Sequence, residues 1–127
     1  MGFALTCIGL LGLLVFGLGL GVSRMRGQTG KFIGCNEDPA DPLYKWVRAH
    51  ANACEFAPMF AILIYALANS GYGGWHGLLY AAAVFVRYSH AAGMILSPTL
   101  DRGHPLRLVG AVGTYIVGII LSLAAIF

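Results

Sequence analysis

Residues 2–23 read GFALTCIGLLGLLVFGLGLGVS, contain no charged side chain and decide the class of the fold. A helix needs about 20 apolar residues to cross a bilayer, so this stretch predicts a transmembrane span. No basic segment precedes it, and Arg24 and Arg26 follow it. A cleaved signal peptide has its basic residues before the apolar run. We therefore interpret the stretch as a retained span whose N-terminus lies outside the cytoplasm.

The composition of the whole chain is that of a membrane protein. Of its 127 residues, 58% are hydrophobic and only 10% are charged. Soluble domains contain about 25% charged residues. So few charges cannot cover a water-facing surface, so we expect membrane lipids around the chain. The formal net charge of +3 is then a topology signal, and no nucleic-acid partner is expected.

Glycines, prolines and two polar loops divide the remaining residues into three further spans, at about 43–69, 75–96 and 105–127. With the first span, these predict a single domain over residues 1–127, an all-α integral membrane protein with a four-helix transmembrane bundle in each subunit. Lysine and arginine occur in the loops after the first and third spans, but not in the short link at 69–74. The positive-inside rule therefore places both loops in the cytoplasm and both termini outside it.

A polar stripe runs along the second span. At 100° per residue, Arg48, Asn52 and Glu55 fall within about 60° of arc. His50 and Cys54 point to roughly the opposite side of the same helix. Three polar groups on one face of an apolar helix indicate a common role, in which His50 has no obvious part.

The third span brings Arg87 to about the depth of Asn52, with a side chain long enough to reach Glu55. A charge at mid-bilayer costs at least about 2.5–3.5 kcal/mol, so Glu55 and Arg87 should face each other, a wet cavity or a ligand. One interpretation is a structural pair that only joins two helices. The other is a cytoplasm-facing pocket for a small zwitterion with more than one carboxylate, which would also explain Arg48 and Asn52.

The stretch RAHANACEFAP at 48–58 resembles the MAPEG family (membrane-associated proteins in eicosanoid and glutathione metabolism), and its short bacterial members above all. The resemblance covers the whole chain. Its specific parts are Arg48-x-x-x-Asn52-x-x-Glu55-x-x-Pro58, then Arg87-x-x-His90 with Gly93, and finally Pro105-x-Arg107-x-x-Gly110.

This resemblance implies a homotrimer with twelve spans that binds glutathione as a co-substrate between neighbouring subunits. It implies a glutathione transferase or peroxidase that turns the thiol into a thiolate for attack on a hydrophobic electrophile or lipid from the bilayer. It also implies an integral, multi-pass protein of the bacterial inner membrane. The implied glutathione-binding residues are Arg48, Asn52, Glu55, His90, Arg87, Arg24 and Arg26. The implied catalytic residue is Arg107, with Arg102 as second choice, because a nearby cation favours a thiolate at neutral pH.

Other readings remain open at this level. Met94, Phe56 and Ala111 stand where several enzymatic relatives have tyrosine, which weakens the case for a particular eicosanoid synthase. The chain could be a non-catalytic lipid- or glutathione-binding protein, or a structural subunit with a Glu55–Arg87 pair.

The remaining candidates for chemistry give weak signals. The three cysteines, Cys7, Cys35 and Cys54, form no metal or disulfide pattern and are interpreted as small apolar residues or inert thiols. The histidines form no zinc pattern, so no metal is expected. Gly110, Thr114, Gly118 and Ser122 line one face of the fourth span, where close packing inside a subunit is at least as good an explanation as a subunit interface.

Overall fold

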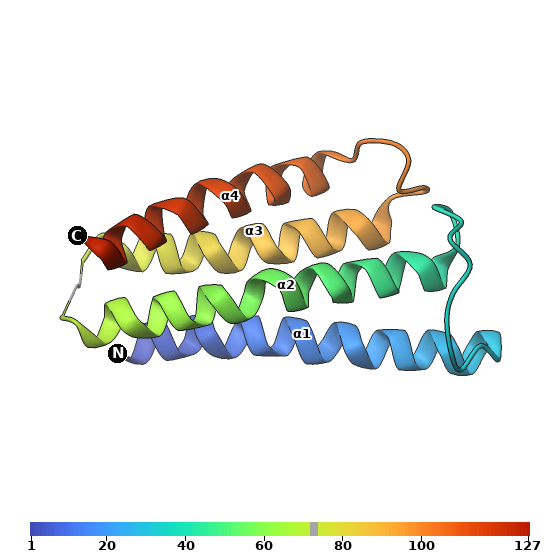
Figure 1. Cartoon of the computed structure of the whole chain (residues 1–127), viewed down its shortest axis with the longest axis horizontal. Helices are drawn as coiled ribbons and strands as arrows, with labels where there is room; N and C mark the ends of the chain where they lie inside the picture. The colour runs from blue at the N-terminus through green and yellow to red at the C-terminus, as the bar shows by residue number, and fades with distance from the viewer. Residues whose placement is uncertain (72–73) are drawn as a thin grey trace.

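The computed structural model describes residues 1–71 and 74–127, and it consists of four long helices: α1 (Gly2–Thr29), α2 (Pro42–Asn69), α3 (His76–Leu96) and α4 (Pro105–Ile126). They lie side by side as a bundle, with both termini at one end (Figure 1). Each helix is long and apolar enough to cross a membrane, and no strand occurs among the described residues. The chain is therefore an all-α membrane protein. Residues 72 and 73, in the uncharged link expected at 69–74, lie outside the described residues.

The helix ends follow from local chemistry. The sequence predicted that the first span ends at residue 23, but α1 continues to Thr29. Gly30 then turns the chain with a φ of 66°. A left-handed glycine is a common helix stop, because it has no Cβ to oppose that conformation. α2 begins at Pro42, and the carboxylate of Asp41 accepts a hydrogen bond from the Tyr44 N–H at 3.0 Å. This cap pairs one of the free amides of the first turn.

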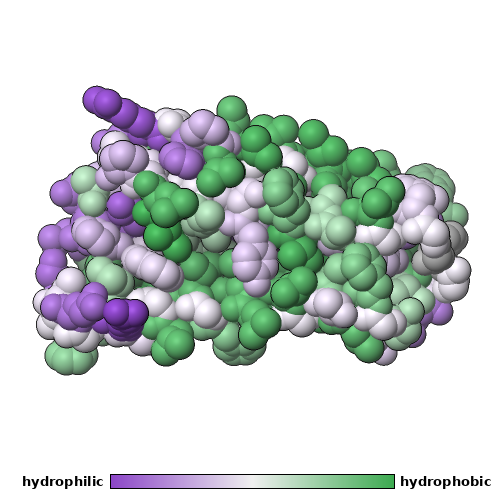
Figure 2. All heavy atoms as spheres, turned by 180° about the vertical axis from the view of Figure 1, so that it is seen from behind, coloured by the Kyte–Doolittle hydropathy of each residue, from purple (hydrophilic) through white to green (hydrophobic). Residues whose placement is uncertain are grey.

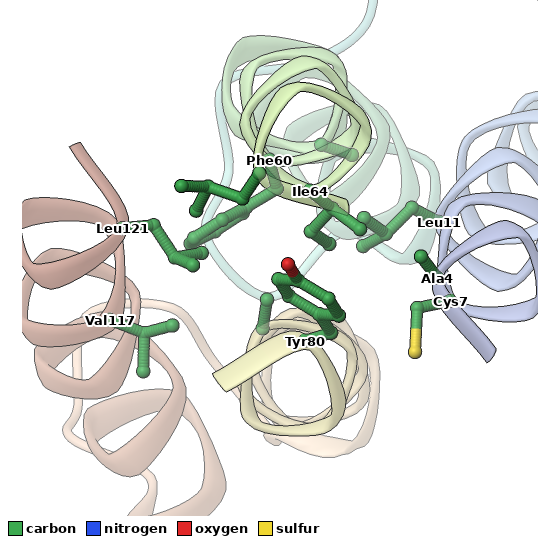
Figure 3. Packing of buried hydrophobic residues seen from close by; sticks show 11 residues of the cluster. Ala4, Cys7, Leu11, Phe60, Ile64, Tyr80, Val117 and Leu121 are labelled. Carbon is green, nitrogen blue, oxygen red and sulfur yellow. The ribbon is translucent and has the colours of Figure 1, made fainter. Parts of the chain in front are cut away.

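The core lies between α2 and α3, with α1 on one side and α4 on the other (Figure 3). α1 packs chiefly on α2, and α4 packs chiefly on α3. Residues from all four helices meet in one apolar cluster, which includes Ala4, Cys7 and Leu11 of α1, Phe60 and Ile64 of α2, Tyr80 of α3, and Val117 and Leu121 of α4.

Glycine brings α3 and α4 into close contact. A methyl group at Gly110 would lie 2.4 Å from the backbone nitrogen of His90, and one at Gly93 would lie 2.3 Å from that of Arg107. Neither backbone atom can move aside cheaply, so only glycine fits at these two positions. The small-residue face of α4 therefore serves packing inside the subunit at Gly110.

The surface has the pattern of a membrane-embedded bundle. An apolar region covers the middle of the face in Figure 2, and hydrophilic residues gather at the end that carries the loops after α1 and α3. Large apolar side chains are widely exposed on the subunit, Phe16 at 80% and Leu78 at 76% among them. A water-soluble monomer rarely exposes so much contiguous apolar surface, whereas lipid tolerates it.

The two long loops bind each other at that polar end. The backbone N–H of Leu100 donates to the carbonyl of Pro39 at 2.9 Å. The ammonium of Lys45 donates to the carbonyl of Ser97, also at 2.9 Å. These contacts fix the entrance of α4 relative to the start of α2.

Candidate functional site

Arg87 is the most deeply buried charged residue of the chain, with 1% of its surface exposed. From α3, its Nη1 donates to Thr114 Oγ1 of α4 at 3.0 Å. Its Nη2 donates to both the backbone carbonyl and the side-chain oxygen of Asn52 on α2, at 3.1 and 2.5 Å. The Phe56 ring lies over the guanidinium, 5.1 Å from Cζ to the ring centre. Arg87 thus ties three helices together at mid-span.

The ion pair between Glu55 and Arg87 that the sequence suggests is not formed between these two described residues. Arg87 binds Asn52 and Thr114 instead, and Glu55 Oε2 lies 3.5 Å from the amide nitrogen of Asn52. Asn52 therefore stands between the two charges, with its oxygen toward the arginine and its nitrogen toward the carboxylate. The reason is position: Arg87 enters between α2 and α4, on the inner side of Asn52.

The polar stripe of α2 lies at the surface of the subunit. Arg48 and Glu55 are exposed, and Asn52 is half-buried between them and Arg87. The structure brings Asn52, Glu55 and Arg87 into one network. Arg48 shares the stripe through its helical position, one turn before Asn52. The arrangement offers an outward-facing cation and carboxylate, and an amide whose orientation the interior fixes.

A second pair of predicted site residues meets where α3 crosses α4. His90 is buried, and its Nδ1 lies 3.1 Å from the backbone carbonyl of Arg107. A carbonyl only accepts, so Nδ1 carries the proton and donates, which leaves Nε2 as the acceptor of a neutral imidazole. Arg107 is half-buried, and its Nη1 donates to the carbonyl of Leu100 at 2.8 Å. Arg102 is exposed on the loop before α4 and joins neither contact.

The two arginines at the end of α1 differ in their contacts. Arg26 donates through Nη1 to the carbonyls of Lys31 and Gly34, at 3.1 and 2.8 Å, and so folds the following loop back on the helix. Arg24 is exposed and lines a hollow between α1 and Trp46 of α2. Arg24 therefore has the freer charged group of the two.

A groove of about 270 Å³ opens between α2 and α4 beside the Arg87 network. Phe56 and Thr114, which both contact Arg87, belong to its wall. The Phe56 and Tyr115 rings meet edge to face, with centres 6.0 Å apart. The rest of the wall is almost entirely apolar: Met59, Phe60, Leu63, Gly118, Ile119, Ser122 and Leu123.

Sequence reasoning missed Thr114 and this groove. Thr114 occupies a position of the small-residue face, and a threonine there is equally suited to helix packing. The apolar residues of the groove have the same pattern as residues that face lipid. No group of three potential metal ligands is placed to hold an ion within residues 1–71 and 74–127.

The family model of the MAPEG family matches residues 4–127. No curated protein matches the chain.

Proposed function

Because this chain belongs to the MAPEG family, whose membrane proteins act in eicosanoid and glutathione metabolism, we propose that it is a glutathione-dependent membrane enzyme of the transferase or peroxidase type. It would hold the glutathione thiol as a thiolate and direct it at hydrophobic electrophiles from the bilayer. The observation that carries the proposal is the outward-facing Arg48, Asn52 and Glu55 stripe, with Asn52 held in place by Arg87.

The stripe has the groups that this tripeptide requires. Glutathione contains two carboxylates, one ammonium and two amides. Arg48 is suited to a carboxylate, because a guanidinium donates two parallel hydrogen bonds. Glu55 is suited to the ammonium, and the remaining donor and lone pair of Asn52 are suited to an amide. Arg87 is enclosed by protein, so its part is to orient Asn52 rather than to touch the ligand.

The exposure of the stripe also favours a homotrimer with twelve spans. Arg48 and Glu55 lie on the surface of the isolated subunit. Glu55 is about 20 Å along α2 from Pro42, where lipid contact with a charge costs at least about 2.5–3.5 kcal/mol. A neighbouring subunit over this face would remove that contact and enclose the ligand. Arg24 is then the better candidate of the α1 arginines to reach a neighbour's site. A detergent-corrected mass of a monomer or dimer would contradict this assembly.

Arg107 is the proposed stabiliser of the thiolate, and Arg102 is the alternative. Arg107 is half-buried, and its bond to Leu100 leaves further N–H groups of the guanidinium for the sulfur. A partly desolvated cation stabilises an anion more than a hydrated one does. With the loops after α1 and α3 in the cytoplasm and both termini outside, glutathione would enter from the cytoplasm of a bacterial cell. The α2–α4 groove offers the electrophile an apolar site beside the network.

The second candidate is a non-catalytic protein that binds glutathione or a lipid. Met94, Phe56 and Ala111 favour it, since they supply no hydroxyl at positions where enzymatic relatives have tyrosine. The third reading, a structural subunit, would rest on the contacts of Arg87 with Asn52 and Thr114, since Glu55 and Arg87 are linked, among the described residues, only through Asn52.

An absorbance titration separates the candidates. Glutathione added to the purified protein should produce the ultraviolet band of a thiolate, and the Arg107→Ala variant should bind glutathione with a much weaker band. Binding without a band in the parent protein would favour the non-catalytic candidate. No binding at all would exclude both.

A further inference from the structure

Thr114 of α4 lies at the inner end of the network that holds the polar stripe. It is 3% exposed, and its Oγ1 accepts a hydrogen bond from Arg87 Nη1 at 3.0 Å. Glu55 of the stripe is exposed, with Asn52 between it and Arg87. We propose that Thr114 is a positioning residue that determines specificity: by holding Arg87 on α4, it keeps the Glu55 carboxylate free for the ammonium group of the ligand. The inference rests on the proposed function, because the ligand is the same glutathione.

The packing of α3 on α4 places the Thr114 hydroxyl in front of the guanidinium. A methyl group at Gly110 would lie 2.4 Å from the backbone nitrogen of His90, so the two helices are in close contact at this level. They run in opposite directions (Figure 1). Arg87, three residues before His90, therefore faces Thr114, four residues after Gly110. The contact between Arg87 and Thr114 follows from the glycine contact one turn away.

The hydroxyl of Thr114 is fixed as an acceptor for Arg87. Its own proton goes to the backbone carbonyl of Gly110, at 2.6 Å. The oxygen then offers a lone pair to Arg87 Nη1, and the hydroxyl cannot turn its proton toward the cation without losing the bond to Gly110. Serine can make the same two contacts, whereas valine has the shape of threonine and can make neither. This difference allows the hydroxyl to be tested without a change of volume.

Glu55 is the competing acceptor for Arg87. A carboxylate binds a guanidinium more strongly than a neutral hydroxyl or amide does. It is also near, since Glu55 Oε2 lies 3.5 Å from the Asn52 amide whose oxygen binds Arg87. Without the Thr114 hydroxyl, Nη1 becomes a buried donor that has lost its acceptor, and Arg87 Nε is already buried without a partner in the described part of the chain. The guanidinium should then turn toward the carboxylate.

Such a turn would change what the stripe can recognise. A Glu55 carboxylate paired with Arg87 has its charge compensated from inside the protein, so it attracts a ligand ammonium far less. Arg48 would keep its proposed part, because a ligand carboxylate does not depend on Glu55 for its binding. The hydroxyl of Thr114 therefore controls the preference for a ligand with an ammonium group, rather than the affinity for every peptide of this shape.

Ser122 provides a matched control on the same helix. Its Oγ donates to the Gly118 carbonyl at 2.8 Å, just as Thr114 donates to Gly110. It lies two turns beyond Thr114, about 12 Å further along α4 and away from Arg87. Ser122→Ala thus removes the same kind of local bond without disturbing the guanidinium. The matched ligands are glutathione and its analogue glutaryl-cysteinyl-glycine, in which a hydrogen replaces the amino group.

Calorimetric titration of the full chain in lipid nanodiscs measures the Kd of both peptides. The parent, Thr114→Ser and Ser122→Ala should prefer glutathione over the analogue about tenfold or more, since one charge-assisted hydrogen bond separates the two ligands. Thr114→Val should bind the two peptides about equally. A Thr114→Val protein that binds both more weakly but keeps the full preference would show a merely structural role and overturn the proposal. Thr114→Ala serves in the same way if Thr114→Val does not fold.

A second measurement needs no ligand. In the parent, Glu55→Gln should leave the unfolding temperature nearly unchanged. In the Thr114→Val background the same change should lower it clearly, because Glu55 has become the partner of Arg87. An equally small effect of Glu55→Gln in both backgrounds would overturn the proposal, whether or not glutathione binds. If this coupling is present but the parent binds neither peptide, the proposed function is contradicted and the hold of Thr114 on Arg87 is supported.

Discussion

Arg87 donates to both oxygens of Asn52, one from the backbone and one from the side chain, across the α2–α3 boundary. This relationship determines which end of the Asn52 amide faces outward. With its oxygen bound inside, the nitrogen points to Glu55. A buried cation thus sets the orientation of a polar group at the surface, and the interior and the proposed ligand site become parts of one network.

Asn52→Ala and Glu55→Gln should have different effects because only Asn52 supports Arg87. Asn52→Ala leaves Nη2 of a buried guanidinium without its side-chain acceptor and should lower the free energy of unfolding by about 1–3 kcal/mol. Glu55→Gln should change that stability by less than about 1 kcal/mol and weaken glutathione binding about tenfold or more. Thermal unfolding in detergent and calorimetric titration measure the two quantities. A marked loss of stability in Glu55→Gln would return Glu55 to the role of Arg87's partner.

Arg107→Ala should reduce turnover on the order of 10²–10³-fold, since it removes a cation from the thiolate. Its effect on glutathione affinity should be smaller. Arg102→Ala should have a modest effect, because Arg102 is exposed and its charge is screened by water. Steady-state kinetics with a lipophilic electrophile would measure both, and Arg107→Lys is the charge-conserving control. The reverse order of losses would place the thiolate at the loop.

Gly110→Ala should severely destabilise the bundle, because the added methyl group would overlap the backbone of His90. Overpacking of a close contact costs about 1–3 kcal/mol and occasionally more. Gly118→Ala is the matched control on the same helix, since its methyl group would lie 3.7 Å from the Phe60 ring, an ordinary contact. Unfolding temperatures of the two variants should differ clearly. Similar values would mean that α3 and α4 can separate without loss.

Arg24→Ala and Arg26→Ala should separate an effect on glutathione binding from an effect on the order of the loop after α1. Arg26 bonds two loop carbonyls, so its loss should expose the segment at 30–41 to proteases without weakening glutathione binding. Arg24 makes no such bond, and its loss should lower glutathione affinity if it reaches a neighbouring subunit. Limited proteolysis and calorimetric titration of both variants would decide this. Weaker binding in Arg26→Ala alone would exchange the two roles.

The sequence was sufficient for the architecture because hydropathy and the spacing of charges act over whole segments. Four apolar stretches can be recognised from composition alone, and the helical period brings Arg48, Asn52 and Glu55 to one face. The end of α1 was harder to predict from the sequence. Arg24 and Arg26 resemble the start of a loop, yet the helix continues to Thr29, because long cationic side chains can extend to water from a helix.

The network inside the bundle could not be predicted in the same way. Helical spacing gives the face on which a residue lies, but it does not say which of two nearby acceptors an arginine will choose. Arg87 could reach Glu55 or Asn52 from its depth, and the position of Thr114 on α4 favours the inward choice. The identity of Thr114 as a partner requires the packing of α4 on α3, which depends on the close contacts at Gly93 and Gly110.

The division of the bundle into α1 packed on α2, and α3 packed on α4, bears on how the chain enters its membrane. Synthesis proceeds from the N-terminus, so the first hairpin is complete before Arg87 leaves the ribosome. Asn52 is by then embedded and available as an acceptor, and Thr114 arrives last with α4. Arg87, the residue most costly to insert, therefore has its acceptor on α2 already in the bilayer. The next helix to be translated, α4, then encloses it.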